Sequence, residues 1–287
     1  MIYQDDTIVI GAVAYDPKIV TIWDGFQAWL GQRGLKFDYV LYSNYERQVA
    51  GHLAGHFHAA WNSPLAWLQT ERAAKAAGRE ARAVVMRDTD RDLTSVVVTK
   101  ADGPIGAIED LRGKRVAVGA KDSPQATLIP LHALAEAGLV AGEDFELVPF
   151  EVGVGKHGDH IGGERDAVKA LLAGDADAAC MIDGNHLAFT REGTVPTGAT
   201  RILLQTGPYD HCNFTVLDDA PAALIGRFRE LLLSMSYGDP EVRPLLDLEG
   251  LKVWTDGRTS GYGLLEGAID RFGTIDDFIA SMGKRCM

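Results

Sequence analysis

The segment GAKDSPQATLIP, residues 119–130, places the end of a strand directly before the start of a helix. It continues the apolar run RVAVGA (115–120), which is typical of a buried strand. Pro124 suits the first helical position because its missing N–H would have no partner inside the helix. The segment therefore predicts a strand, a tight turn and a helix, which is the repeating unit of α/β proteins.

The same alternation continues along the chain. Strands are expected at 7–15, 37–43, 59–63, 81–88, 93–100, 115–120, 145–151, 178–183, 201–206 and 213–219. Amphipathic helices are expected at 18–34, 45–57, 63–78, 123–138 and 164–176, and the end of the chain reads as helical. Two glycine-rich stretches, 151–165 and 190–201, read as loops. The pattern predicts an α/β fold with mostly parallel sheets flanked by helices.

Composition excludes several classes of function. The 287 residues carry 28 basic and 40 acidic side chains, so the formal charge of -12 argues against a nucleic-acid-binding surface. No apolar stretch approaches the ~18 residues of a membrane span, so membrane insertion is not expected. The first residues, MIYQDD, carry acidic side chains where a signal peptide would be basic. We therefore expect a cytoplasmic protein if Met1 is the native start, and a periplasmic protein if a leader was removed.

Four segments, in this order, carry a resemblance to a known family: SNYERQVAGHLAGHFHAAWNSPLAW (43–67), DLTSVVVTKADGPIGAIEDLRGKRVAVGAKDSPQATLIP (92–130), GERDAVKALLAGDADAACMID (163–183) and TGPYDHCNFTVLDDAP (206–221). Together they resemble the substrate-binding subunits of ABC importers for phosphonate, phosphite and phosphate. The resemblance implies a two-lobed type II periplasmic-binding-protein fold, with the ligand cleft between the lobes and closure about hinge segments. The chain differs from the family at Glu164 and Arg165, where a Ser-His pair is usual, and at His58.

The expected lobes follow from this resemblance. Lobe 1 is discontinuous and comprises 1–92 plus 208–287, and lobe 2 comprises 93–207. The family's ligand is a small anion, and an ABC permease would be the partner if this chain is exported.

The start of the helix after residue 120 is the first candidate ligand site. A helix start leaves N–H groups without partners and carries partial positive charge, so it favours an anion. Ser123, Gln125, Ala126 and Thr127 are the candidate ligand residues there. In the alternative interpretation, Asp122 or Ser123 only caps the helix.

Other candidates complete an anionic or zwitterionic ligand site. Asn62 and Ser63 end a strand, and Tyr15 and Tyr45 would each offer a hydroxyl and an apolar wall. Each of these is also compatible with an ordinary cap or a half-buried tyrosine. Arg165 would clamp an anion with two hydrogen bonds, unless it pairs on its own helix face, and Asp183 would receive a ligand amine.

Loop histidines support a second hypothesis. His157, His160, His186 and His211, together with Asp183, would ligate a transition metal or perform acid-base chemistry if their loops converge. The alternative function is then a cytoplasmic enzyme on the same fold, with His160, His211 and Asp183 as catalytic candidates and a small anionic metabolite as substrate. No complete catalytic motif occurs in the chain, and scattered loop histidines often have no such role, so we favour the binding protein over the enzyme.

Overall fold

The computed structural model describes residues 6–158 and 162–271, which form two compact units. Within the described residues, unit 1 comprises 6–91 and 210–261, and unit 2 comprises 92–209 and 262–271. The chain crosses from one unit to the other at 91/92, at 209/210 and at 261/262. The helix at 263–271 belongs to unit 2 because it packs on α4, which differs from the predicted lobe 1 that extends to the C-terminus.

Unit 1 is built on one six-stranded sheet with the order β11-β4-β10-β3-β1-β2. Its strands are β1 (Thr7–Val13), β2 (Lys36–Tyr42), β3 (Ala59–Asn62), β4 (Ala81–Arg87), β10 (Asn213–Leu217) and β11 (Trp254–Asp256). Its helices are α1 (Lys18–Gln32), α2 (Tyr45–Leu53), α3 (Pro64–Ala76), η1 (Asp88–Asp90), α7 (Ala222–Ser234) and α8 (Arg243–Glu249).

Alternation along β1 explains why helices cover both faces of this sheet. Ile8 and Ile10 point into the large core formed with α1, α7 and α8. Val9 and Val13 point to the other face, where Val13 meets α2 and α3. Successive side chains of a strand face opposite sides, so a strand apolar at every position is buried from both sides. The structure therefore confirms the predicted α/β class.

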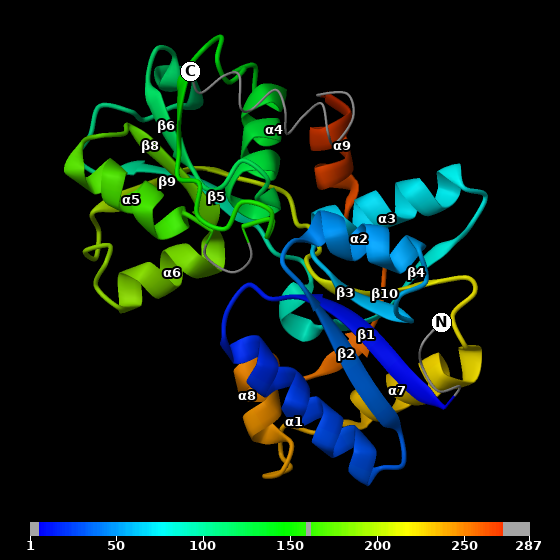
Figure 1. The fold of residues 1–287 in the computed structure, drawn as a ribbon. Coiled ribbons are helices and arrows are strands. Elements are labelled where there is room, and N and C mark those ends of the chain that lie inside the picture. The colour runs from blue at the N-terminus through cyan, green and yellow to red at the C-terminus, as the bar shows by residue number, and fades with distance from the viewer. Residues whose placement is uncertain (1–5, 159–161, 272–287) are drawn as a thin grey trace. The chain divides into compact units, whose positions relative to one another are not determined.

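Unit 2 holds a five-stranded sheet with the order β7-β6-β8-β5-β9. Its strands are β5 (Ser95–Lys100), β6 (Arg115–Val118), β7 (Glu146–Pro149), β8 (Ala178–Ile182) and β9 (Thr200–Gln205). Its helices are η2 (Ile108–Leu111), η3 (Pro124–Leu128), α4 (Ile129–Glu136), α5 (Glu164–Ala173), α6 (Asp183–Arg191) and α9 (Gly263–Arg271). Among these, α5 and α6 pack against the cluster that includes Val98 and Ala179, and α9 packs on η3 and α4 (Figure 1).

Both sheets are mixed, which refines the expectation of mostly parallel sheets. In unit 1, β1 pairs in parallel with β2 and β3, whereas β10 and β11 form antiparallel pairs. In unit 2, β6 pairs in parallel with β7 and β8, whereas β5 is antiparallel to β8 and β9. In each unit the three strands that pair in parallel therefore end at the same edge of the sheet.

Among the described residues, no helix has both the length and the apolar character to cross a membrane.

Candidate functional site

The segment after β6 opens with a π-helix, η3, before the α-helix α4 begins at Ile129. Ser123 caps this start, because its Oγ accepts a hydrogen bond from the N–H of Ala126 at 3.2 Å. The N–H groups of Thr127 and Leu128 both donate to the carbonyl oxygen of Ser123. The Thr127 hydroxyl donates to the Ala120 carbonyl at 2.8 Å, so it holds the preceding turn. The capping interpretation therefore describes Ser123, and Thr127 has a structural partner.

Gln125 provides the donor that this helix start leaves available. Its backbone N–H has no hydrogen-bond acceptor among the described residues, and its side chain is 1% exposed. Its carbonyl oxygen accepts from the Ser95 hydroxyl at 2.6 Å, and its Nε2 donates to the Gly158 carbonyl at 2.7 Å. A buried N–H at a helix start is an anion-binding group, since it lacks a partner and lies at the positive end of the helix dipole.

The glycine-rich stretch after β7 packs its backbone against this helix start. A Cβ atom on Gly158 would lie 2.5 Å from the Cβ of Ser123, and one on Gly119 would lie 2.4 Å from the carbonyl oxygen of Gly162. Gly158 also has a positive φ of 60°. Glycine is needed here because any side chain would collide with backbone or with the capping serine. His160, a predicted metal and catalytic candidate, lies outside the described residues.

Glu164 is a buried carboxyl group that the sequence-based site did not include. It is the first residue of α5, and its side chain is 0% exposed. Its Oε2 accepts from the N–H of Ile182 at 3.2 Å and from Nδ2 of Asn185 at 2.7 Å, while its Oε1 has no hydrogen-bond partner in the described part of the chain. Burial raises the pKa of Glu164 to about 8, although the Asn185, Ile182 and Gln125 donors oppose the shift. The departure from the family's Ser-His pair was the available signal for it.

Arg165 does not face the same environment as Glu164. Its guanidinium forms an ion pair with Glu192, donates to the Thr194 hydroxyl at 3.1 Å and lies 4.5 Å over the ring of Phe189. These contacts hold Arg165 at the end of α6, so its partners lie on another element and not on its own helix face, where the alternative interpretation expected them. The anion clamp stays a prediction, and it would require the guanidinium to add to or exchange these partners.

Asp183 begins α6 at the carboxyl end of β8 and is partly exposed. Its Oδ2 accepts from the Thr94 hydroxyl at 2.8 Å and its Oδ1 from the N–H of Gly184 at 2.6 Å. Both oxygens can accept a further donor, so Asp183 can still receive a ligand amine.

Unit 1 presents its candidates at the carboxyl edge of β1, β2 and β3. Tyr15 follows β1 and is half-buried, whereas Tyr45 begins α2 and is 1% exposed against Val13 and Val49. Ser63 caps α3 through a hydrogen bond from the N–H of Ala66 at 3.1 Å. The edge position is the one where α/β proteins bind ligands.

Asn62, at the end of β3, lies in a buried hydrogen-bond network of unit 1. Its Oδ1 accepts from Nε2 of Gln48 at 2.8 Å, and its Nδ2 donates to the Thr215 hydroxyl at 2.9 Å. Gln48 also donates to the carbonyl oxygen of Trp61. Buried amides need such partners, and these contacts tie α2 to β3 and β10. The Asn62 side chain is thus engaged in the fold rather than presented to a ligand.

The described histidines have separate surroundings. His186, on α6, lies 2.9 Å from the Thr200 hydroxyl, and burial lowers its pKa. His157 is 1% exposed, has a positive φ of 52° and belongs to unit 2. His211 belongs to unit 1 and contacts Cys212 and Asp90.

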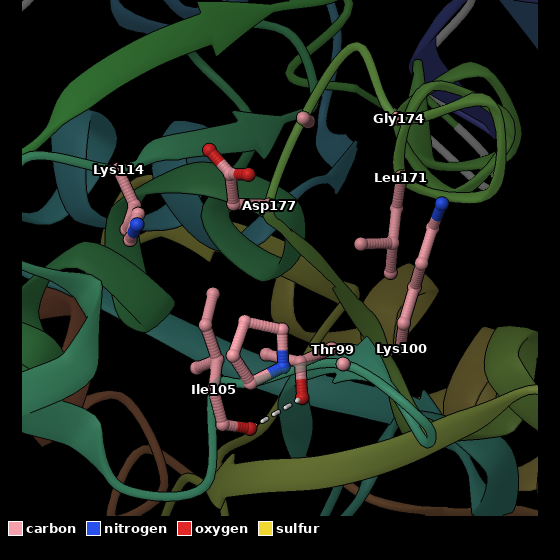
Figure 2. A pocket seen from close by; sticks show the side chains of 10 residues that line it. Thr99, Lys100, Ile105, Lys114, Leu171, Gly174 and Asp177 are labelled. Carbon is pink, nitrogen blue, oxygen red and sulfur yellow. Dashed lines mark hydrogen bonds between the residues drawn. The ribbon is translucent and has the colours of Figure 1, made fainter.

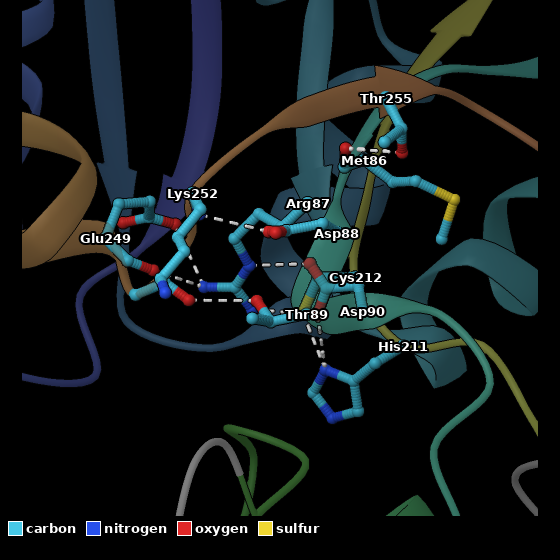
Figure 3. A network of polar contacts seen from close by, with 11 residues as sticks. Met86, Arg87, Asp88, Thr89, Asp90, His211, Cys212, Glu249, Lys252 and Thr255 are labelled. Carbon is cyan, nitrogen blue, oxygen red and sulfur yellow. Dashed lines mark hydrogen bonds and ion pairs between the residues drawn. The ribbon is translucent and has the colours of Figure 1, made fainter. Parts of the chain in front are cut away.

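Asp90, His211 and Cys212 have the spacing of a metal site, with ligand atoms within 4.8 Å of one another (Figure 3). Both Asp90 oxygens, however, are held by the buried Arg87 guanidinium at 2.5 and 2.9 Å. Arg87 also pairs with Glu249 at 3.2 Å. A metal cation here would have to displace or adjoin a buried guanidinium, so the group fits an internal ion-pair network better than a metal centre.

A cavity of about 110 Å³ lies at the other end of the unit 2 sheet (Figure 2). Its lining includes Lys100 at the end of β5, Lys114 just before β6 and Asp177 just before β8. It therefore lies at the amino ends of the parallel strands β6 and β8. Ligands of α/β sheets bind beyond the carboxyl ends, where Gln125 and Asp183 are found.

Solved structures share this fold at low sequence identity. PhnD1 from Prochlorococcus marinus, in complex with methylphosphonate, matches with a TM-score of 0.71 and 15% identity, over 95% of this chain and 100% of that chain. XAC2383 from Xanthomonas citri, bound to ATP, matches with a TM-score of 0.69 and 14% identity, over 99% and 100%. The periplasmic aliphatic sulphonate binding protein SsuA from Escherichia coli matches with a TM-score of 0.54 and 18% identity, over 93% and 84%. These similarities confirm the periplasmic-binding-protein fold.

The sequence itself matches a family model. The model is described as "ABC transporter, phosphonate, periplasmic substrate-binding protein", and the match runs over residues 10–262. This range covers most of both units and all three junctions between them. The chain therefore belongs to the family of phosphonate-type periplasmic substrate-binding proteins of ABC transporters.

Proposed function

We propose that this protein binds a small oxyanion of the phosphonate or sulfonate class and presents it to an ABC permease. The observation that carries the proposal is the backbone N–H of Gln125, buried at the start of η3 and lacking an acceptor among the described residues. Family membership supports a binding function. Structural relatives hold methylphosphonate or are named as sulphonate-binding proteins, which supports this class of ligand.

The proposed ligand donor in unit 2 is the N–H group of Gln125, next to the Ser123 side chain that caps the start of η3. In unit 1, Tyr15, Tyr45 and Ser63 remain our candidates because they follow the carboxyl ends of parallel strands. Asp183 would select ligands that carry an amine in addition to the oxyanion, since both of its oxygens retain accepting capacity.

Export and the permease partner are part of the same proposal. The family is one of periplasmic proteins, which supports the periplasmic alternative and gives no support to the cytoplasmic one. The enzyme alternative also lacks support from the family.

The experiment measures anion binding by calorimetry, with methylphosphonate, methanesulfonate, phosphate and sulfate as probes. Ser123→Asn and Ser123→Asp both keep a capping side chain of nearly equal size, and only Ser123→Asp adds negative charge. We expect Ser123→Asp to bind the best probe at least about tenfold more weakly than Ser123→Asn, because like charges repel in a buried site.

Ala107→Asp is the matched control, since it adds the same charge at the exposed start of η2 in the same unit. It should leave the affinity close to that of the wild type. The proposed function is wrong if none of the four probes binds, or if the two Ser123 variants bind equally well.

A further inference from the structure

Glu164 and Gln125 bring a buried carboxyl group next to the proposed anion site. The Gln125 residue that offers its backbone N–H has its side chain against Glu164, and this contact is one of the influences on the Glu164 pKa. Glu164 lies within unit 2, where α5, β8 and α6 supply its other partners. The charge state of Glu164 therefore acts directly on the residue that would hold the anion.

The hydrogen bonds around Glu164 leave one of its oxygens without a donor. Among the described residues, Oε2 accepts from Ile182 and Asn185, whereas the buried Oε1 has no hydrogen-bond partner. The amide of Gln125 is held by Gly158, whose carbonyl oxygen accepts from Nε2, and its contact with Glu164 lowers the Glu164 pKa less than burial raises it. A buried carboxylate oxygen without a donor is costly, and a proton on it removes the charge.

The charges nearby agree with a protonated acid. No cation among the described residues shifts the pKa of Glu164, and a buried carboxylate without a cation is costly. The charge of Glu164 acts on Cys180 on β8 and on Tyr209. Burial raises the pKa of Cys180 to about 12 and also raises that of Tyr209, so both stay neutral. Asp183 follows Ile182 and adds further negative charge on this side. The neighbouring Arg165 is paired with Glu192.

We propose that Glu164 carries a proton at neutral pH and that this proton controls the anion site, which binds while Glu164 is neutral and releases its anion when Glu164 ionises. The proposal rests on the proposed function, because it assumes that an anion binds at Gln125. Ionisation would place a carboxylate next to the residue that holds the anion. The repulsion between the two negative charges weakens binding as the pH rises, so the site favours capture in neutral or acidic surroundings.

The first measurement needs no ligand. Carbon-13 NMR of the protein labelled at the glutamate carboxyl carbon, recorded from about pH 4 to pH 10, follows each ionisation, and the signal absent from Glu164→Gln identifies Glu164. We expect this signal to titrate near pH 8, as the Glu164 pKa of about 8 indicates. A titration in the ordinary glutamate range overturns the proposal, whatever the anions do.

The second measurement follows the affinity for methanesulfonate, whose charge stays constant over the pH range used. In the wild type we expect the affinity to fall about tenfold for each pH unit above the Glu164 transition, because binding then requires the uptake of one proton. In Glu164→Gln, which keeps a neutral side chain at every pH, the affinity should remain constant. Glu143→Gln, an exposed substitution in the same unit, removes the same charge and should behave like the wild type.

The two measurements separate the possible failures. A protonated Glu164 combined with a pH-independent affinity in the wild type overturns the control of the site while leaving the proposed function intact. Absence of binding at any pH overturns the proposed function and the control together, and the NMR titration still reports on the proton. If Glu164→Gln does not fold, the wild-type NMR and affinity curves must show the same midpoint for the proposal to stand.

Discussion

Asp90 and Glu164 are carboxyl groups equally removed from water, and their pKa values shift in opposite directions. Asp90 is 1% exposed and Glu164 is 0% exposed. Burial alone would raise both pKa values, and it does so for Glu164. In Asp90 the charge and hydrogen bonds of Arg87, with His211 adding to them, hold the pKa well below its usual range. The difference teaches that the presence of a cation, not the depth of burial, decides whether a buried acid is ionised.

The largest expected effect comes from removing that cation. Arg87→Met leaves Asp90 and Glu249 buried without their partner, and we expect unfolding free energy to fall by about 3 to 5 kcal/mol at neutral pH. Denaturant unfolding monitored by circular dichroism measures the change. The deficit should shrink in mild acid, because Asp90 would then resemble Glu164 and take up a proton.

Arg229→Met is the control for this variant. Arg229 pairs with Asp256 in the same unit, but the pair is largely exposed, with 44% and 62% of the side chains accessible. Exposed pairs contribute little, so stability should hardly change. An equal loss in both variants would contradict the role assigned to the buried cation.

The next effect concerns the acid that has no cation. The folded-state pKa of Glu164, about 8, lies above its ordinary value of 4.5, so its contribution to stability is complete below pH 4.5 and is lost as the pH rises through 8. The full shift corresponds to at most about 5 kcal/mol. Glu164→Gln avoids this loss but buries a second N–H without a partner, at a cost of about 1 to 3 kcal/mol. We expect it to exceed the wild type by about 2 kcal/mol at pH 8.

The measurement is a pair of denaturation series from about pH 5 to pH 8. The advantage of Glu164→Gln should grow steadily with pH and should vanish or reverse near pH 5. A constant difference between the two proteins across this range would mean that Glu164 is already ionised in the folded state.

His52 gives the smallest effect and the opposite sign. This buried histidine stacks on Phe57, and burial lowers its pKa to about 4, although a hydrogen bond with the backbone of His58 opposes the shift. Its folded-state pKa lies below the ordinary 6.5, so its contribution to stability is present above pH 6.5 and is lost as the pH falls through 4. Between pH 7 and pH 5.5 the wild type should lose about 1 kcal/mol from this source.

His52→Leu removes the titrating ring and should remove this part of the pH dependence. Thermal unfolding at both pH values checks it. Parallel curves for the wild type and His52→Leu would show that His52 does not resist protonation, and the comparison of buried groups would then hold for acids only.

Much of the fold follows from local pattern. The apolar run at 7–15 forms β1, and the segment with helical spacing at 18–34 forms α1. Each pattern is compatible with only one type of element that buries its apolar side chains. The antiparallel strands could not be foreseen, since an apolar strand buried on both faces reads the same in either direction. The short strand β11 and helix α6 carry too few residues for a recognisable period.

The site was predictable in position but less so in detail. The start of η3 follows from Pro124 and the strand before it, whereas Asn62 and Arg165 each have a partner more than twenty positions away. Asn62 meets Thr215, and Arg165 meets Thr194. Sequence spacing does not register such distant contacts. The sequence marked Glu164 only as a departure from the family's usual residue. Its burial could not be predicted, because it depends on how α5, β8 and α6 pack together.

The backbone contacts of Gly119, Gly158 and Gly162 limit how this protein can change its ligand. A methyl group on any of them would meet backbone or the capping serine at 2.6 Å or less. These three glycines, on the loop side of the start of η3, therefore cannot be substituted without a collision. Positions that already carry a side chain, such as Glu164, remain available for substitution. Libraries designed to alter specificity should hold these three glycines fixed and vary the residues on which the charge of the site depends.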